Sequence, residues 1–289
     1  MKAQKILQTI SAAGLITTLL ASCSPTEEIN ALKQRTLDNL VFVEGGTFMM
    51  GDVGYEDENG QFRNFGPDAD AFPAHQVTLT SYSILRYEIT YAEYDLFAEV
   101  TGREKPMQRF RKEVYTGPDY PVKGVTWDES RAYCQWIGEQ LGYPMDLPTE
   151  AQWEYAARSR GKAVAYATDN GEFEPGRNIR DATKIWHPMP VGSWPPNPLG
   201  LYDMTGNVDE WTVDYWRAYR PGAVVNPRHD EYQKLKSDQK VTRGSGILGG
   251  RGQITLYVRA VRDQDNTGAG IGIRCVANHP EPITEARAK

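Results

Sequence analysis

The chain has only three cysteines and four histidines among its 289 residues, and its lysines and arginines form no basic cluster. Because the net charge is −6 and no basic patch exists to contact phosphates, nucleic acid is a poor candidate partner. The histidines form no His-x-His or His-x-x-x-His pair, so they indicate no metal centre. A content of 40% hydrophobic and 24% charged residues excludes a disordered chain and a polytopic membrane protein.

Residues 1–22 have the pattern of a secretory signal. Lys2 and Lys5 precede an apolar run that is too short and too polar to span a bilayer. The run ends in Leu-Ala-Ser-Cys, which resembles the bacterial lipobox, so we expect Cys23 to be lipidated and to anchor the chain to a membrane. An ordinary signal peptide with a chance cysteine is the alternative. Ser24 in place of aspartate favours the outer membrane of a bacterial envelope, facing the periplasm or the surface.

The rest of the chain is interpreted as a lipidated tether (residues 23–40), one domain (residues 41–280) and a polar tail (residues 281–289). Ile29–Leu40 is expected to form a short helix that spaces the domain from the membrane. The acidic stretch 52–72 offers carboxylates for calcium. It lacks the spacing of an EF-hand loop, however, and is interpreted as a solvated loop.

Local signals predict an α+β domain that is irregular and low in regular secondary structure. Cys134, Ile137 and Leu141 share one face of a predicted helix and are expected to be buried. Strands are predicted over residues 41–43, 45–51, 76–80 and 257–262, and where apolar residues alternate from Ile271 to Ala277. Three capping boxes predict helix starts, namely Thr90 with Glu93, Thr126 with Glu129 and Thr149 with Gln152.

Six ordered stretches carry a resemblance to a known family. They are Gly45–Gly51 (GGTFMMG), Glu88–Thr90 (EIT), Pro121–Trp127 (PVKGVTW), Leu147–Arg158 (LPTEAQWEYAAR), Gly200–Trp211 (GLYDMTGNVDEW) and Gly270–Cys275 (GIGIRC). Over about residues 41–278 the chain resembles the formylglycine-generating enzymes, whose domain is also called the sulfatase-modifying-factor domain. The resemblance implies an irregular α+β fold related to the C-type lectin fold.

The same resemblance puts copper chemistry in doubt. Members of the family that oxidise a substrate cysteine hold copper with two cysteines, in a segment that corresponds to Arg243–Ile254. The two positions fall at Gly249 and Ile254, and no cysteine lies between Cys134 and Cys275. Because thiolates select Cu(I), we expect no copper and no formylglycine generation.

The resemblance implies a disulfide between Cys134 and Cys275, since the family pairs cysteines at these two positions. An exported chain permits this chemistry. Two separate buried thiols are the alternative.

Structural calcium is implied at two places. At the first, Asn207 and Glu210 would supply side-chain oxygens and Val208 a carbonyl, a ligand set that suits Ca²⁺. A tight turn, in which Asn207 and Glu210 bond backbone amides, is the alternative. Asn178 and Ile179 are the second candidate pair.

Arg259, Arg262 and Arg274 could form an anion site. In the family, such arginines mostly tie irregular loops together through buried hydrogen bonds, and we favour that interpretation.

Two functional classes remain open. The missing copper cysteines favour a lipoprotein that binds or regulates a protein partner in an envelope machine of the secretion or motility type, without catalysis. The alternative is a copper-independent oxidase of the same superfamily that acts on a peptide or siderophore precursor. Apolar Ile247, Leu248 and Ile254 favour a filled groove over an open catalytic pocket.

Overall fold

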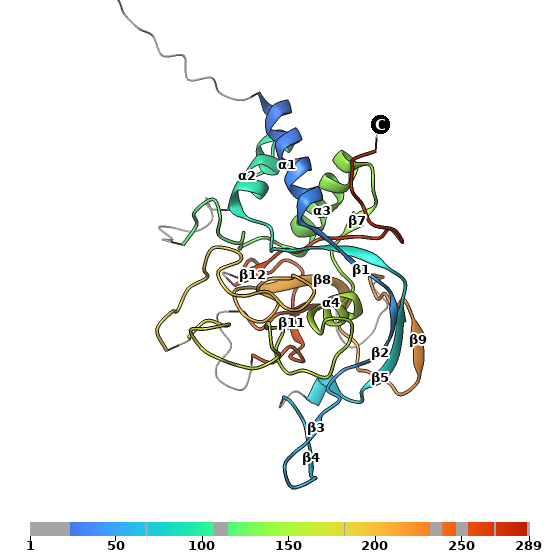
Figure 1. Ribbon diagram of the computed structural model, residues 1–289. Coiled ribbons are helices and arrows are strands. Elements are labelled where there is room, and N and C mark those ends of the chain that lie inside the picture. Colours follow the sequence, from blue (N-terminus) through green and yellow to red (C-terminus); the bar gives the residue numbers. More distant parts are fainter. Residues whose placement is uncertain are drawn as a thin grey trace, which may run out of the picture.

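The computed structural model describes residues 24–66, 69–106, 115–181, 183–231, 239–246, 254–268 and 270–287 (Figure 1). The helices within these ranges are α1 (Pro25–Asn39), α2 (Tyr91–Thr101), α3 (Trp127–Leu141), α4 (Glu150–Ala157) and the 3₁₀ helix η1 (Ala69–Ala71). Residues 1–23, and with them the expected lipidation site Cys23, lie outside the described part of the chain.

Short strands form four small sheets. The first has the order β1-β6-β13-β7, formed by Leu40–Val43, Tyr82–Leu85, Val276–Ala277 and Met145–Asp146. The second has the order β11-β10-β8-β12, formed by Ala260–Arg262, Lys240–Arg243, Asp209–Tyr215 and Ile271–Gly272. The third has the order β2-β5-β9 (Gly46–Met50, His75–Leu79, Ala223–Val225), and β3 (Tyr55–Glu56) pairs with β4 (Phe62–Arg63) in a hairpin. The predicted irregular α+β fold is confirmed.

The three predicted capping boxes are all formed. The Thr126 side chain accepts the N–H of Glu129, and the Glu129 carboxylate accepts the N–H of Thr126 at 2.9 Å. The same exchange opens α2 at Thr90 and α4 at Thr149. Each exchange satisfies backbone donors that have no partner inside the helix, which is why these three starts could be predicted.

A fourth capping box, between Ser24 and Glu27, opens α1 at Pro25, four residues before the expected helix start. Leu32 is buried in the core beside residues of α2 and α3, and Leu37 packs against the same cluster. The helix expected to act as a spacer therefore lies against the domain (Figure 1).

The predicted strand from Ile271 to Ala277 is wrong as one element, because the chain changes sheets along it. Ile271 and Gly272 pair in parallel with β8, whereas Val276 and Ala277 pair antiparallel with β6 and β7. Every residue from Ile271 to Ala277 is buried. The alternation of apolar residues gave no sign of this change, since both faces of the segment are covered.

The expected disulfide is present. Cys134 on α3 and Cys275 beside β13 are bonded, with their Cα atoms 5.5 Å apart. Both lie in the larger of two buried clusters, together with Ile137 and Leu141 from the predicted apolar face of α3. The bond joins the central helix to the point where the chain enters the first sheet.

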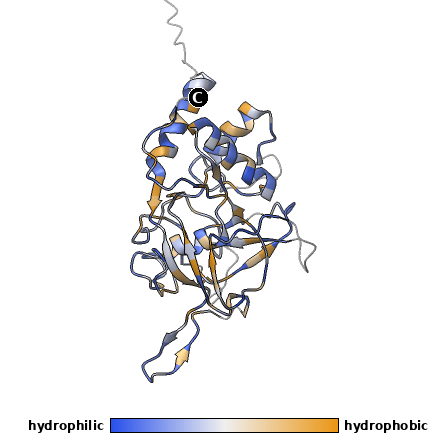
Figure 2. Cartoon of the chain, turned by 90° about the vertical axis from the view of Figure 1, so that its right-hand side faces the viewer, coloured by the Kyte–Doolittle hydropathy of each residue, from blue (hydrophilic) through white to orange (hydrophobic). Residues whose placement is uncertain are grey.

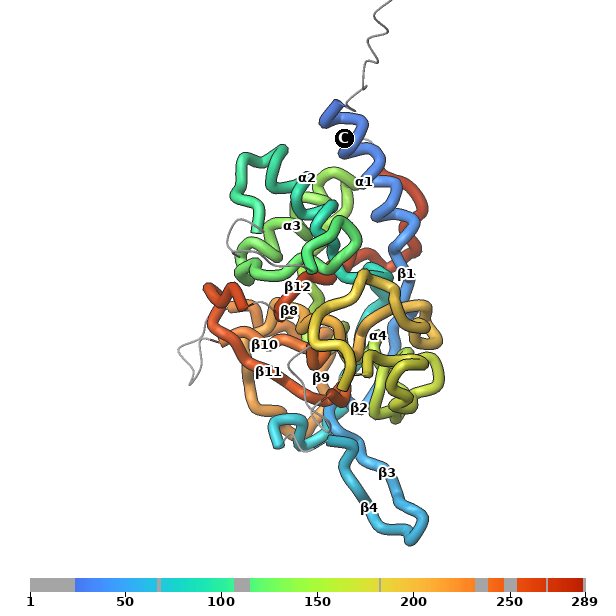
Figure 3. The backbone as a smooth tube through the Cα atoms, turned by 90° about the vertical axis from the view of Figure 1, so that its left-hand side faces the viewer, coloured from blue at the N-terminus to red at the C-terminus, as the bar shows by residue number. Residues whose placement is uncertain are grey.

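The molecule is elongated, with α1 at one end and the β3–β4 hairpin at the other (Figures 1 and 3). Figure 2, turned by 90° from the first view, shows the same hairpin extending away from the body. Within the described ranges, no helix has the length and apolar character needed to cross a bilayer.

Candidate functional site

The segment that corresponds to the family's copper site follows β10. Of the two expected cysteine positions, Gly249 lies outside the described residues. Ile254 is described, and only 8% of its surface is exposed. At Ile254, to which the resemblance assigns one of the copper cysteines, the side chain is apolar and nearly buried, and the two described cysteines are already bonded to each other. Ile254 has no donor atom for a metal ion, so this position does not fit copper.

Buried charges connect this segment to α4. Arg243, at the end of β10, donates to Glu150 at 2.7 Å and to Glu154 at 2.8 Å. Arg259 donates to both carboxylate oxygens of Glu150, at 2.6 and 2.8 Å, and Arg158 donates to Glu154 at 2.9 Å. Burial alone would raise the pKa of Glu150, but Arg259 and Arg243 hold it at about 2. Glu150 therefore stays ionised, and both carboxylates are paired with arginines, so they are poor candidates for general acid–base catalysis.

The same arginines also hold loops. Arg259 donates to the carbonyls of Asp70 and Arg217, which are far from it in sequence. Arg262 is one-third exposed and reaches Asp209 at 3.4 Å. Arg259 therefore ties distant loops together, whereas Arg262 donates to the carbonyl of its neighbour Val261 and makes a weak, partly exposed ion pair.

Two hydroxyl groups next to Ile254 were missed by sequence reasoning. The side chains of Thr255 and Tyr257 are buried, and neither hydroxyl has a hydrogen-bond partner among the described residues. Burial raises the pKa of Tyr257 above its ordinary value. Nothing in the sequence distinguishes these two residues from ordinary core residues.

At the first expected calcium site, the side chains already have other partners. Both oxygens of Glu210 accept hydrogen bonds from Arg274, and Oε2 also accepts from Trp153 Nε1 at 2.7 Å. The Asn207 amide oxygen accepts the N–H of Met189, and its nitrogen donates to Glu88. A divalent ion beside Glu210 would face a fixed guanidinium, so this arrangement does not fit calcium. These contacts give no support to the calcium predicted through Asn207, Val208 and Glu210, and we do not propose it.

The second expected site is different. Asn178 is 3% exposed, and its amide nitrogen lies 3.0–3.3 Å from four oxygen atoms. These oxygens belong to the side chains of Asp169, Asn170 and Glu174 and to the carbonyl of Glu172. Four converging oxygens with two carboxylates among them are a donor set that suits Ca²⁺. The amide oxygen of Asn178 accepts the N–H of Glu174 at 3.0 Å, so the hydrogen bonds direct its nitrogen toward these four oxygens, and a bound ion would have to displace that nitrogen.

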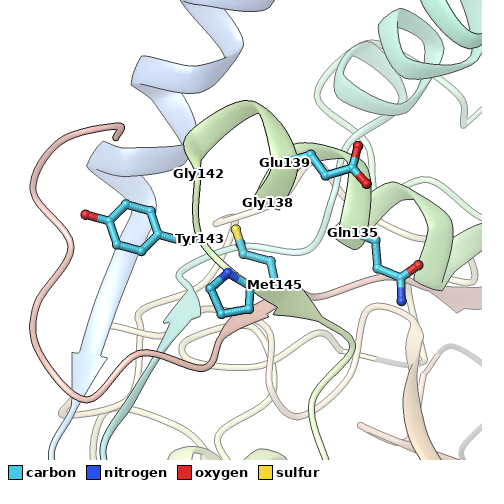
Figure 4. A pocket seen from close by; sticks show the side chains of 7 residues that line it. Gln135, Gly138, Glu139, Gly142, Tyr143 and Met145 are labelled. Carbon is cyan, nitrogen blue, oxygen red and sulfur yellow. The ribbon is translucent and has the colours of Figure 1, made fainter. Parts of the chain in front are cut away.

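We also searched for clusters of metal-ligating side chains elsewhere in the described residues. In the part of the chain that the structure describes, no three or more histidine, cysteine, aspartate and glutamate side chains gather closely enough to hold a metal ion. A surface depression of about 310 Å³ lies at the C-terminal end of α3, lined by residues that include Gln135, Glu139 and Tyr143 (Figure 4). None of its lining residues comes from β10 or from the segment after Ile254.

Solved structures define the class of fold. PvdO from Pseudomonas aeruginosa superposes with a TM-score of 0.64 and 24% sequence identity, over 82% of this chain and 93% of that one. The irregular α+β domain described here is therefore a formylglycine-generating-enzyme-like fold.

Sequence comparison gives the family. The sulfatase-modifying factor enzyme 1-like domain matches residues 25–279, starting with α1. The formylglycine-generating enzyme of Bos taurus is 26% identical over 300 residues, which cover 83% of this chain and 75% of that enzyme. The inactive C-alpha-formylglycine-generating enzyme 2 of Bos taurus is also 26% identical, over 86% of this chain and 90% of that protein. The chain belongs to the sulfatase-modifying-factor family.

Proposed function

We propose that this protein is an envelope-anchored lipoprotein whose sulfatase-modifying-factor domain binds or regulates a protein partner and does not oxidise a substrate cysteine. The partner would be a component of a cell-envelope machine of the secretion or motility type. The observation that carries the proposal is Ile254, an apolar and nearly buried residue at a position where the family's oxidases need a thiolate.

Two further observations support a binding role. Two carboxylates that contact Arg243, those of Glu150 and Glu154, are paired with arginines and are poorly placed for proton transfer. One relative that aligns over 86% of this chain is named as inactive, and the aligned residues are 26% identical. Loss of the enzymatic activity is therefore known within the family, judging by that protein's name.

The experiment that tests this proposal measures metals and thiols in residues 24–289, purified without chelator. We expect no stoichiometric copper or iron and no free thiol, because Cys134 and Cys275 are bonded. Oxygen consumption with a cysteine-containing peptide should equal that of a peptide-only blank. Stoichiometric copper or iron, or peptide-dependent oxygen uptake, would overturn a non-catalytic role.

The copper-independent oxidase remains the second candidate. The buried hydroxyls of Thr255 and Tyr257, which have no hydrogen-bond partner among the described residues, favour it because they lie one and three residues after Ile254. Under this alternative, Tyr257→Phe would abolish oxygen uptake with a peptide or siderophore precursor. Under the binding proposal, the same substitution has no effect on uptake, and it stabilises the fold by removing an unsatisfied hydroxyl.

We also propose that calcium binds at Asn178 and has a structural role. The ion would replace contacts within the loop 169–178, which has few backbone hydrogen bonds. The remaining part of the proposal is membrane attachment through Cys23. Globomycin blocks the cleavage of lipoprotein signal peptides, so cells treated with it should accumulate a chain that retains residues 1–22.

A further inference from the structure

The β3–β4 hairpin has two faces of different character. Tyr55 lies opposite Arg63, and Glu56 lies opposite Phe62. Since paired residues of antiparallel strands share a face, Tyr55 and Phe62 point to opposite sides.

One face is directed toward the body of the protein. The Tyr55 ring lies 5.0 Å from Phe65, which stacks on the buried ring of Tyr257 at 5.5 Å. On the same face, the Asp57 carboxylate accepts a hydrogen bond from Arg63 at 3.0 Å, and its other oxygen accepts the N–H groups of Asn59 and Gln61. The side chains on this inner face therefore have packing or hydrogen-bond partners within the protein.

The base of the hairpin is fixed as well. The buried carboxylate of Asp52 accepts the N–H groups of Gly54, Phe65 and Gly66 at 2.9–3.2 Å. A two-stranded hairpin of this size has little stability of its own. The contacts of Asp52 and Asp57 therefore hold it in one conformation, projecting from the end of the molecule opposite α1 (Figures 1 and 3).

The other face carries one large apolar side chain, Phe62, which no described residue covers on its outer side. Phe62 is 64% exposed. Its ring lies close against Gly54, where a Cβ atom would come within 2.2 Å of the ring. Glu56 lies directly opposite, and Glu58 follows in the exposed turn. An aromatic side chain held in place beside two carboxylates, for which the described residues supply no ion-pair partner, has the character of an interface anchor.

We propose that this hairpin face, formed by Gly54, Glu56, Glu58 and Phe62, docks into an apolar pocket on a partner protein that is rimmed by lysines or arginines. The inference rests on the proposed binding function. Charge complementarity indicates what kind of partner binds here. The carboxylates that flank Phe62 favour a partner whose apolar pocket is rimmed by cationic side chains. Anionic lipid headgroups would repel these carboxylates, and a second copy of a chain with net charge −6 is disfavoured for the same reason.

The test is site-specific photo-crosslinking with the full chain in cells. Benzoylphenylalanine replaces Phe62 in one strain and Val225, a 70% exposed residue on β9, in the control strain. We expect a discrete adduct from position 62 only, in a partner peptide that carries lysine or arginine beside apolar residues. Combining the crosslinker with Glu56→Lys and Glu58→Lys should reduce its yield at least tenfold, while Glu231→Lys, an exposed reversal elsewhere, should not.

Three outcomes would overturn the inference. They are an adduct with a second copy or with lipid, an adduct that is insensitive to the charge reversals, and no adduct from position 62. An adduct from position 225 alone would remove the hairpin from the interface and leave the binding function standing. If neither position gives an adduct and the protein consumes oxygen in a peptide-dependent manner, both the hairpin interface and the proposed binding function are wrong. Unfolding midpoints of all variants, expected to match the parent because the changed side chains are exposed, exclude misfolding as the cause.

Discussion

Arg274 and Glu210 form an ion pair with no solvent exposure at the point where the chain passes between two sheets. The guanidinium lies 2.6–3.0 Å from the Glu210 carboxylate. Its remaining N–H groups donate to the carbonyls of Leu85, Arg86 and Tyr202. One side chain therefore satisfies carbonyls from two distant segments and neutralises a carboxylate on β8.

Arg274→Met should destabilise the domain by about 3–5 kcal/mol, because it leaves Glu210 buried without a counter-charge. Urea unfolding measures the loss. Lys105→Gln, which removes an exposed pair with Glu99, is the control and should leave the unfolding midpoint unchanged. The double variant combines Arg274→Met with Glu210→Gln. Its loss of unfolding free energy should be smaller than the sum of the losses of the two single variants, because no unpaired charge is left in the core. Additive losses would show that the two side chains act independently.

The Cys134–Cys275 bond should be a large contributor to stability. It closes a loop with a sequence separation of 141 residues, for which the chain-entropy model gives about 5 kcal/mol as an upper figure. The double change Cys134→Ala and Cys275→Ala in residues 24–289 should lower the free energy of unfolding by 2–5 kcal/mol, about the range seen for native disulfides. Thiol titration of the parent in denaturant should find no reactive thiol before reduction and two after it. A variant as stable as the parent would contradict the expectation.

Asp214 should make stability fall as pH rises. Burial raises its pKa to about 6, although the N–H groups of Glu150 and His229 act against this. In the unfolded chain an aspartate ionises near pH 3.9, so between pH 4 and 6 the folded protein keeps a proton that the unfolded chain releases. The contribution of Asp214 is fully present below about pH 4 and is lost as the pH passes 6.

Asp214→Asn removes this titration. The free energy of unfolding of the parent, measured relative to this variant, should therefore decrease by about 3 kcal/mol between pH 4 and 7. Other groups titrate equally in both proteins and cancel. Parallel stability profiles of the two proteins would show that Asp214 ionises normally.

The predictable parts of the fold are those set by local chemistry. Thr90, Thr126 and Thr149 mark helix starts because their side chains bond residues three positions later, and this signal needs no tertiary contact. The pairing of Cys134 with Cys275 came from the family resemblance, because cysteine spacing alone does not fix connectivity.

The unpredicted parts depend on contacts between distant segments. The change of sheets around Arg274 depends on Glu210 and on carbonyls near Leu85, which no local pattern reveals. The position of α1 depends on the burial of Leu32, with Leu37 packed beside the same cluster, in a segment that is mostly polar. The hairpin at residues 55–63 has strands of two residues each, too short for an alternation signal.

Calcium should stabilise the loop 169–178. Asp169 and Glu174 now pair with Arg177, and an ion at the amide of Asn178 would compete with this arginine for both carboxylates. At a calcium concentration 100 times the dissociation constant, the gain is about 2.7 kcal/mol. Thermal unfolding of residues 24–289 should therefore shift upward with calcium, return with chelator, and shift little with magnesium, which demands stricter geometry. Asp169→Asn should abolish the shift, whereas Glu58→Gln, an exposed acid on the hairpin, should preserve it. If calcium leaves the parent unchanged, Arg177 is the resident counter-charge of this loop, and Arg177→Gln should then destabilise the parent.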